Sequence, residues 1–206
     1  LDHPGRDRER GRIWKITYKG PGVAAQGKES RTDWSSASIK ELLQGLKRNN
    51  LKERMLITDR LSDYFGLQAV AAIEALLQSG NADAYQCVHG LWILHRLGAL
   101  RDERIRKASK DGNPLIRLHT MRIIKELGQR QGYFQEEIRV GLKDEDVHVR
   151  RAAAEALAAM GGDDAFAQLL EFIPSIPDED THLNYTAYLG LCNVLKNEEL
   201  LREGAK

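Results

Sequence analysis

The charged side chains that could do chemistry in this sequence recur at a fixed spacing. Asp111 precedes Arg117 by six residues, and Asp144 precedes Arg150 by the same interval. An arginine in such a pattern can bind an acidic partner or form an ion pair inside the protein. We favour a structural ladder, in which each arginine pairs with an aspartate of its own or of the adjacent segment.

The histidines and acidic clusters do not form a recognisable catalytic or metal-binding set. No two histidines stand four residues apart, as on a zinc-binding helix, and Cys87 and Cys192 fit no metal spacing. Glu136-Glu137 and residues 178–180 fall near predicted helix starts, where acidic groups favour the helix dipole. We therefore expect surface or boundary histidines, no catalytic residue, no metal and no cofactor in this chain. The histidines in question are His89, His95, His119 and His148.

The elements that must position these residues are repeated helices. Residues 143–161 read KDEDVHVRRAAAEALAAMG, and residues 110–128 read KDGNPLIRLHTMRIIKELG. In both, apolar residues recur at helical spacing and a glycine follows, in the position that lets a helix end in a left-handed conformation. Four such glycines, Gly66, Gly98, Gly128 and Gly161, close the second helix of successive predicted pairs.

The pattern predicts five antiparallel helix pairs that must stack to bury a core. Ser38 and Glu41 predict a capping box, Pro114 a helix start, and Asp163 a helix cap. The predicted pairs are 38–48 with 51–65, 67–79 with 83–97, 101–110 with 114–127, 132–142 with 146–160, and 163–173 with 179–195. A short helix is expected at 197–203.

Composition and net charge limit the classes of molecule that this chain is expected to bind. The 206 residues include 31 basic and 30 acidic side chains, a net charge of +1, so no strong field attracts nucleic acid or an anionic membrane. No apolar run is long enough to span a bilayer. We expect a protein partner, or neighbouring domains of the same chain, with no nucleic acid and no membrane insertion.

These features resemble HEAT repeats: two helices per unit, an aspartate six residues before an arginine, and a small-residue helix that ends in glycine. The resemblance implies an all-α, armadillo-like α-solenoid over residues 38–206. The other pairs match in part. Arg48 stands at the aspartate position before Arg54, Asn81 and Cys87 replace both residues in the second pair, and Asp178 precedes Asn184 in the fifth.

In such solenoids the second helices line the concave side. If that face binds a partner, the candidate residues are Arg54, His89, Arg122 and Arg151.

Residues 1–37 differ from the rest and predict an extended arm and linker, with a strand near residues 13–18. DHPGRDRERGRIWKITYKG resembles the last propeller strand of bacterial putative membrane-bound dehydrogenases of the sorbosone or glucose dehydrogenase type. The resemblance implies a segment of a longer, extracytoplasmic protein, in which a quinone-dependent sugar dehydrogenase propeller precedes the helices and a cytochrome c domain often follows.

We therefore expect a non-catalytic scaffold within such a protein. Two alternatives remain open: a helical-repeat enzyme resembling DNA glycosylases or lyases, and a freestanding adaptor. The parent's substrate, the binding partner and the oligomeric state are not predicted.

Overall fold

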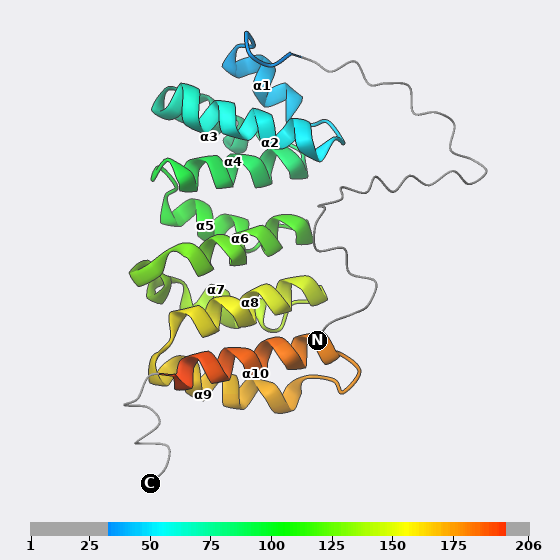
Figure 1. Cartoon of the computed structure of the whole chain (residues 1–206), viewed down its shortest axis with the longest axis vertical. Coiled ribbons are helices and arrows are strands. Elements are labelled where there is room, and N and C mark those ends of the chain that lie inside the picture. Colours follow the sequence, from blue (N-terminus) through cyan, green and yellow to red (C-terminus); the bar gives the residue numbers. More distant parts are fainter. Residues whose placement is uncertain (1–32, 197–206) are drawn as a thin grey trace, which may run out of the picture. The chain divides into compact units, whose positions relative to one another are not determined.

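The computed structural model describes residues 33–196, which fold into successive helix pairs and contain no strand (Figure 1). This confirms the predicted all-α, HEAT-like α-solenoid. The predicted strand at 13–18, most of the predicted arm and the helix at 197–203 lie outside the described residues. The elements are α1 (Ile39–Gly45), α2 (Leu51–Asp59), η1 (Arg60–Phe65), η2 (Gly66–Ala69), α3 (Val70–Gln78), α4 (Ala84–Arg96), α5 (Asp102–Ala108), α6 (Pro114–Glu126), η3 (Gly128–Phe134), α7 (Gln135–Gly141), α8 (Val147–Met160), α9 (Gly162–Phe172), η4 (Ile173–Ser175) and α10 (Thr181–Leu195).

Local sequence signals set the helix ends. The Ser38 hydroxyl accepts from the Glu41 N–H, and the Glu41 carboxylate accepts from the Ser38 N–H at 2.8 Å, which completes the predicted capping box. Asn113 caps α6, whose first residue is Pro114. All four predicted closing glycines have positive φ, between 55° and 67°.

One predicted cap is wrong, and one predicted helix changes type along its length. Asp163 does not cap α9: the helix begins at Gly162 after Gly161, and Asp163 lies within its first turn. The predicted helix 51–65 is α-helical only to Asp59 and then continues as the π-helical turn η1. The Ser62 hydroxyl donates to the Thr58 carbonyl in this turn, one way in which side chains compete with regular helical bonding.

The second helices of the pairs, α2, α4, α6, α8 and α10, pack successively against one another and form one continuous layer. Their packing is uneven. The face of α8 that meets its neighbours is alanine-rich, and Ala153, Ala154 and Ala156 are fully buried, so α6 and α10 can approach α8 closely. The corresponding part of α4 carries the bulky residues Tyr85, His89 and Trp92, which line an open space between α2 and α6.

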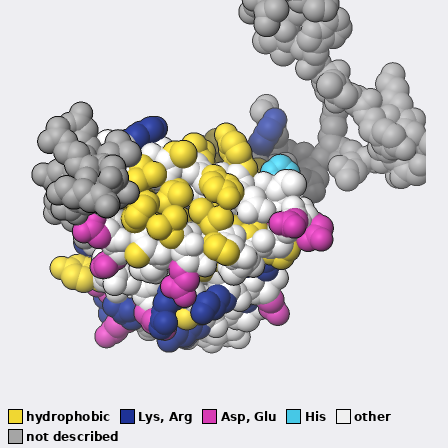
Figure 2. Space-filling model, turned by 90° about the horizontal axis from the view of Figure 1, so that it is seen from below, with side chains coloured by type: hydrophobic (Ala, Val, Ile, Leu, Met, Phe, Trp, Pro, Cys, Tyr) yellow, Lys and Arg dark blue, Asp and Glu magenta, His cyan; other side chains and the backbone are white. Residues whose placement is uncertain are grey.

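Hydrophobic side chains also gather on the α9–α10 end of the stack, which Figure 2 shows from below. The exposed large apolar residues of these two helices are Leu170, Tyr185, Tyr188 and Leu189. A solenoid leaves such a face wherever no further repeat covers it.

Candidate functional site

A groove of about 570 Å³ lies along α4, between α2 and α6. Its floor is one face of α4, because the α4 residues that line it follow helical spacing. Its walls come from α2 and α6. The floor residues are Tyr85, Val88, His89, Trp92, His95 and Arg96, and the wall residues are Leu51, Arg54, Met55, Thr58, Leu115, His119 and Glu126.

Arg54 lies at one end of this groove and is almost fully buried, with 6% of its surface exposed. Its Nη1 donates to the backbone carbonyl of Arg48, and its Nε donates to Nε2 of His89 at 3.2 Å. The guanidinium carbon lies 3.9 Å from the centroid of the Tyr85 ring, a cation–π contact. Within residues 33–196, Arg54 forms no ion pair.

His89 connects Arg54 to Thr58 and is held in one tautomer. Because Nε2 accepts from Arg54, the proton resides on Nδ1, which donates to the Thr58 hydroxyl at 2.8 Å. That hydroxyl donates in turn to the Arg54 carbonyl. Burial, then the charges of Arg54 and His119, lower the pKa of His89 from 6.5 to about 4. His89 is therefore neutral at pH 7.

Trp92 forms the middle of the groove floor. Its indole N–H donates to Nδ1 of His119 at 3.0 Å, which orients the ring. Burial, with the charge of Arg122, lowers the pKa of His119. The centre of the groove is therefore uncharged and largely apolar.

Acidic groups gather at the opposite end from Arg54. His95 lies 3.5 Å from the exposed carboxylate of Glu126. Arg96 pairs with both Asp59 and Asp63, at 2.9 and 3.1 Å. The groove thus has the buried Arg54 at one end, and His95, Arg96 and Glu126 line the other.

Outside the groove, Arg117 of α6 joins the third helix pair to the fourth. Its Nε and Nη2 donate to the two carboxylate oxygens of Asp144 at 2.7 and 2.8 Å, while Nη1 donates to the Asp111 carbonyl. Burial alone would raise the pKa of Asp144. The hydrogen bonds from Arg117 and the backbone N–H of Asp146, with the charges of Arg117 and Arg150, outweigh it and lower that pKa.

Arg150 of α8 is placed in the same way. Its Nη1 donates to the Asp144 carbonyl at 2.8 Å, and its Nη2 lies 3.7 Å from the carboxylate of Asp180. The fifth pair therefore supplies its acidic partner through Asp180, the residue that caps α10. Asp178, which stands at the aspartate position of the fifth repeat, is not the residue that meets Arg150.

We predicted that each arginine pairs with an aspartate of its own or of the adjacent segment. In the structure, the carboxylate contact is made between adjacent helix pairs. Within a pair, each arginine meets the backbone carbonyl of the aspartate six residues earlier. The Asp111 carboxylate instead accepts from the Asn113 N–H at 2.8 Å and supports the turn before α6.

The four predicted partner-binding residues do not form one site. Arg54 and His89 meet in the groove, but Arg122 is exposed on α6 outside its lining. Arg151 on α8 donates to Asp180 at 3.0 Å. The groove itself was not predicted. The sequence signal for it was the contrast between the bulky residues of α4 and the alanines at the corresponding positions of α8.

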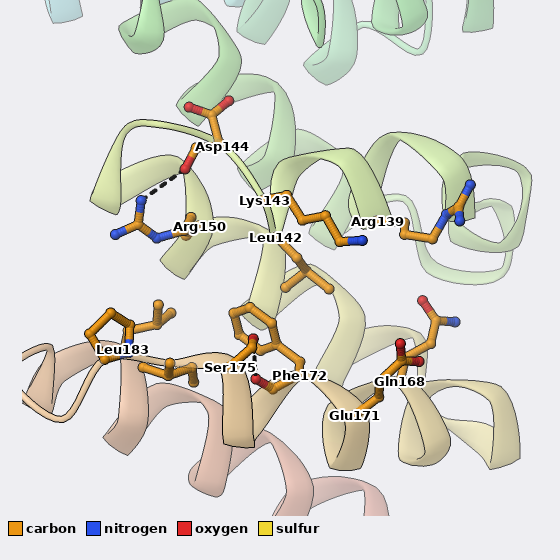
Figure 3. Close-up of a pocket in the computed structure, with 12 residues that line it drawn as sticks. Arg139, Leu142, Lys143, Asp144, Arg150, Gln168, Glu171, Phe172, Ser175 and Leu183 are labelled. Atoms are coloured by element: carbon orange, nitrogen blue, oxygen red, sulfur yellow. Dashed lines mark hydrogen bonds between the residues drawn. The ribbon is translucent and has the colours of Figure 1, made fainter.

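A second hollow of about 590 Å³ lies between the fourth and fifth pairs. Figure 3 shows Leu142 and Phe172 extending into it, with Lys143 and Arg139 above and Glu171 and Gln168 below. Two of its three cations are engaged: Arg139 by Glu136 and Arg150 by backbone carbonyls.

The described residues contain no group of three or more His, Cys, Asp or Glu side chains placed to hold a metal ion. None of the helices within that range combines the length and apolar character that crossing a membrane requires.

Comparison with known proteins identifies the repeat. Residues 97–190 match the family model described as HEAT repeats. This segment spans α5 to most of α10, so the Arg117–Asp144 pair lies within it and the groove lies across its N-terminal edge. No curated protein matches the sequence. The chain therefore contains a HEAT-repeat region, within an α-solenoid that extends to α1.

Proposed function

We propose that this chain is a non-catalytic HEAT-repeat scaffold that docks a protein partner in the groove along α4. The observation that carries the proposal is the wall of α2, where Leu51 and Met55 expose 59% and 49% of their surface into a hollow floored by Trp92. Exposed apolar side chains around an aromatic floor are typical of protein-binding sites.

The chemistry of the groove supports binding rather than catalysis. The Thr58 hydroxyl and the His89 imidazole are both committed to a hydrogen-bonded chain that ends at a backbone carbonyl. Outside the groove lining, burial and then the charges of Asp111 and Asp83 raise the pKa of the Cys87 thiol, which disfavours the nucleophilic thiolate. A glycosylase-like activity would need a strongly basic surface, and a chain with a net charge of +1 does not favour one.

We also propose that the module belongs to a multidomain membrane-bound dehydrogenase-like protein. The support is the resemblance of residues 1–20 to a closing propeller strand. Its partners would then include the neighbouring propeller and cytochrome c domains, and its location would be extracytoplasmic. The natural gene tests this: propeller blades encoded directly before Leu1 would support it, and their absence would favour a freestanding adaptor.

Site-specific photocrosslinking in the source organism tests the docking proposal. A photoreactive amino acid is placed at Met55 in the groove and, as a matched control, at Val140 of α7. The two side chains are equally exposed, at 49% and 50%. We expect a discrete crosslinked protein from position 55 and none from position 140. Identical patterns at both positions would contradict docking in the groove.

A further inference from the structure

We propose that Arg54 is a carboxylate-binding residue, and that the groove takes a peptide segment of a partner protein with an aspartate or glutamate side chain on Arg54. This inference rests on the proposed docking function and specifies its ligand chemistry. The apolar side chains of the same segment would lie along α4, between α2 and α6.

Arg54, Arg117 and Arg150 occupy the same structural position. Each stands four residues after the N-cap of a second helix, and each donates through Nη1 to the backbone carbonyl six residues earlier. Arg117 and Arg150 then meet a carboxylate from the next helix pair. The fold therefore presents one edge of each arginine to an acidic group supplied from outside its own pair.

For Arg54 that acidic group is missing from the described chain. Arg117 meets Asp144, two residues before the N-cap Asp146, whereas Arg150 meets the N-cap Asp180 itself. The residues at these two positions of α4 are Asn81, which has no charge, and the N-cap Asp83, which forms no ion pair with Arg54. The nearby carboxylates are engaged elsewhere. Glu53 pairs with Arg48 at 3.0 Å, and Asp83 accepts from the Gln86 N–H.

Arg54 is consequently a buried cation without a counter-charge, an arrangement that favours binding of an anion. Tyr85 and His89 fix the plane of the guanidinium, and Nη2 donates to no group among residues 33–196. A fixed guanidinium with a free edge matches a carboxylate, which can accept two parallel hydrogen bonds.

The rest of the groove identifies the ligand as a peptide rather than a small anion. Its floor runs from Tyr85 to Arg96, roughly 16 Å along the helix axis, which accommodates about five residues of extended chain. Leu51, Met55 and Trp92 provide apolar contacts along that length. A small anion would leave these contacts unused.

The test uses the whole chain and a phage-displayed library of random dodecapeptides. Enriched sequences are synthesised with acetylated and amidated ends, so that side chains carry their only carboxylates, and binding is measured by fluorescence anisotropy. We expect Asp or Glu beside apolar residues in the enriched set. Changing that acid to its amide should weaken binding roughly tenfold or more.

Variants of the protein test whether Arg54 causes the preference for the acid peptide over its amide. With Arg54→Gln, the acid and amide peptides should bind alike and weakly. Arg139→Gln removes an exposed arginine from α7 and should bind as the wild type does. Because Arg54→Gln also removes hydrogen bonds within the fold, Asn81→Asp is the second test: it places the carboxylate of the Arg117–Asp144 pair beside Arg54. It should weaken binding of the acidic peptide while the chain remains folded.

Three results would overturn the inference. In the first, peptides bind in the groove and lose that binding with Met55→Asp, but their acid and amide forms bind equally. This result would exclude Arg54 as the carboxylate-binding residue and would leave the docking function standing. Binding only by peptides with a free carboxyl terminus would exclude the side-chain carboxylate. A library that yields no peptide for the groove would overturn both proposals.

Discussion

At the scale of single residues, one position performs two tasks in this chain. The arginine four residues after a second-helix N-cap always binds the turn before its own helix. In α6 and α8 it also joins neighbouring pairs through a carboxylate, whereas in α2 it meets a neutral histidine and an aromatic ring. The surrounding residues, not the arginine itself, therefore decide whether this position joins two helix pairs.

Replacing Arg117 with alanine should strongly destabilise the stack. The change strands the Asp144 carboxylate, which is 9% exposed, without its bidentate partner. Breaking a buried pair in this way typically lowers the free energy of unfolding by about 3–5 kcal/mol. Urea unfolding measures the loss. The control is Arg139→Ala, whose pair with Glu136 is more than half exposed and should matter by less than about 1 kcal/mol. Equal effects would argue against the ladder.

His89 should make stability depend on pH. Its pKa is about 4 in the folded chain and near 6.5 when unfolded, so the unfolded chain binds more protons between those values. The free energy of unfolding should therefore be fully retained above pH 6.5 and fall as the pH drops towards 4, by on the order of 3 kcal/mol. His89→Gln should remove this part of the slope, and His148→Gln, at an exposed site on α8, should not. Parallel wild-type and His89→Gln profiles would contradict the prediction.

At the scale of elements, two helices can approach closely where one of them has a glycine, because glycine has no Cβ. A Cβ at Gly190 of α10 would lie 2.8 Å from Cβ of Ala158 in α8, whereas a Cβ at Gly112 meets no atom within 4 Å. Both substitutions restrict the unfolded chain, but only the first forces two packed helices apart.

We therefore expect opposite signs for these two glycine substitutions. Gly190→Ala should lower the free energy of unfolding by about 1–2 kcal/mol, because overpacking exceeds the gain in helix propensity. Gly112→Ala should raise it by roughly 0.5 kcal/mol. Thermal unfolding of both variants checks the pair. Stabilisation by Gly190→Ala would show that α10 is free to move away from α8.

Helix existence could be predicted because it depends on local signals: apolar periodicity, the Ser38 cap and glycines at helix ends. The errors concern features without a local signature. Asp180 rather than Asp178 meets Arg150, because the path of the turn before α10 decides which carboxylate faces α8. The groove could not be predicted, since it forms from helices whose lining residues span positions 51 to 126.

At the scale of the whole molecule, the stack is tight around α8 and open around α4. The alanines of α8 allow extensive contact of α8 with both α6 and α10, whereas the bulky face of α4 lines the groove and α4 has limited contact with α2. In a linear stack, stability is a sum of units and the interfaces between neighbours. An uneven stack is therefore expected to open first at its less tightly joined end.

Amide hydrogen exchange should reveal this gradient. We expect the amides of α6 and α8 to exchange only through global unfolding, and those of α1 and α2 through a smaller, local opening of lower free energy. The physical reason is that α2 packs against α1, η1 and α4, whereas α8 packs against α6, α7, α9, α10 and η3. A peptide bound in the groove would contact α2, α4 and α6 together, and should slow exchange in α2 more than in α8. Uniform protection across the stack would contradict the gradient, and a peptide effect confined to α8 would contradict the position of the groove.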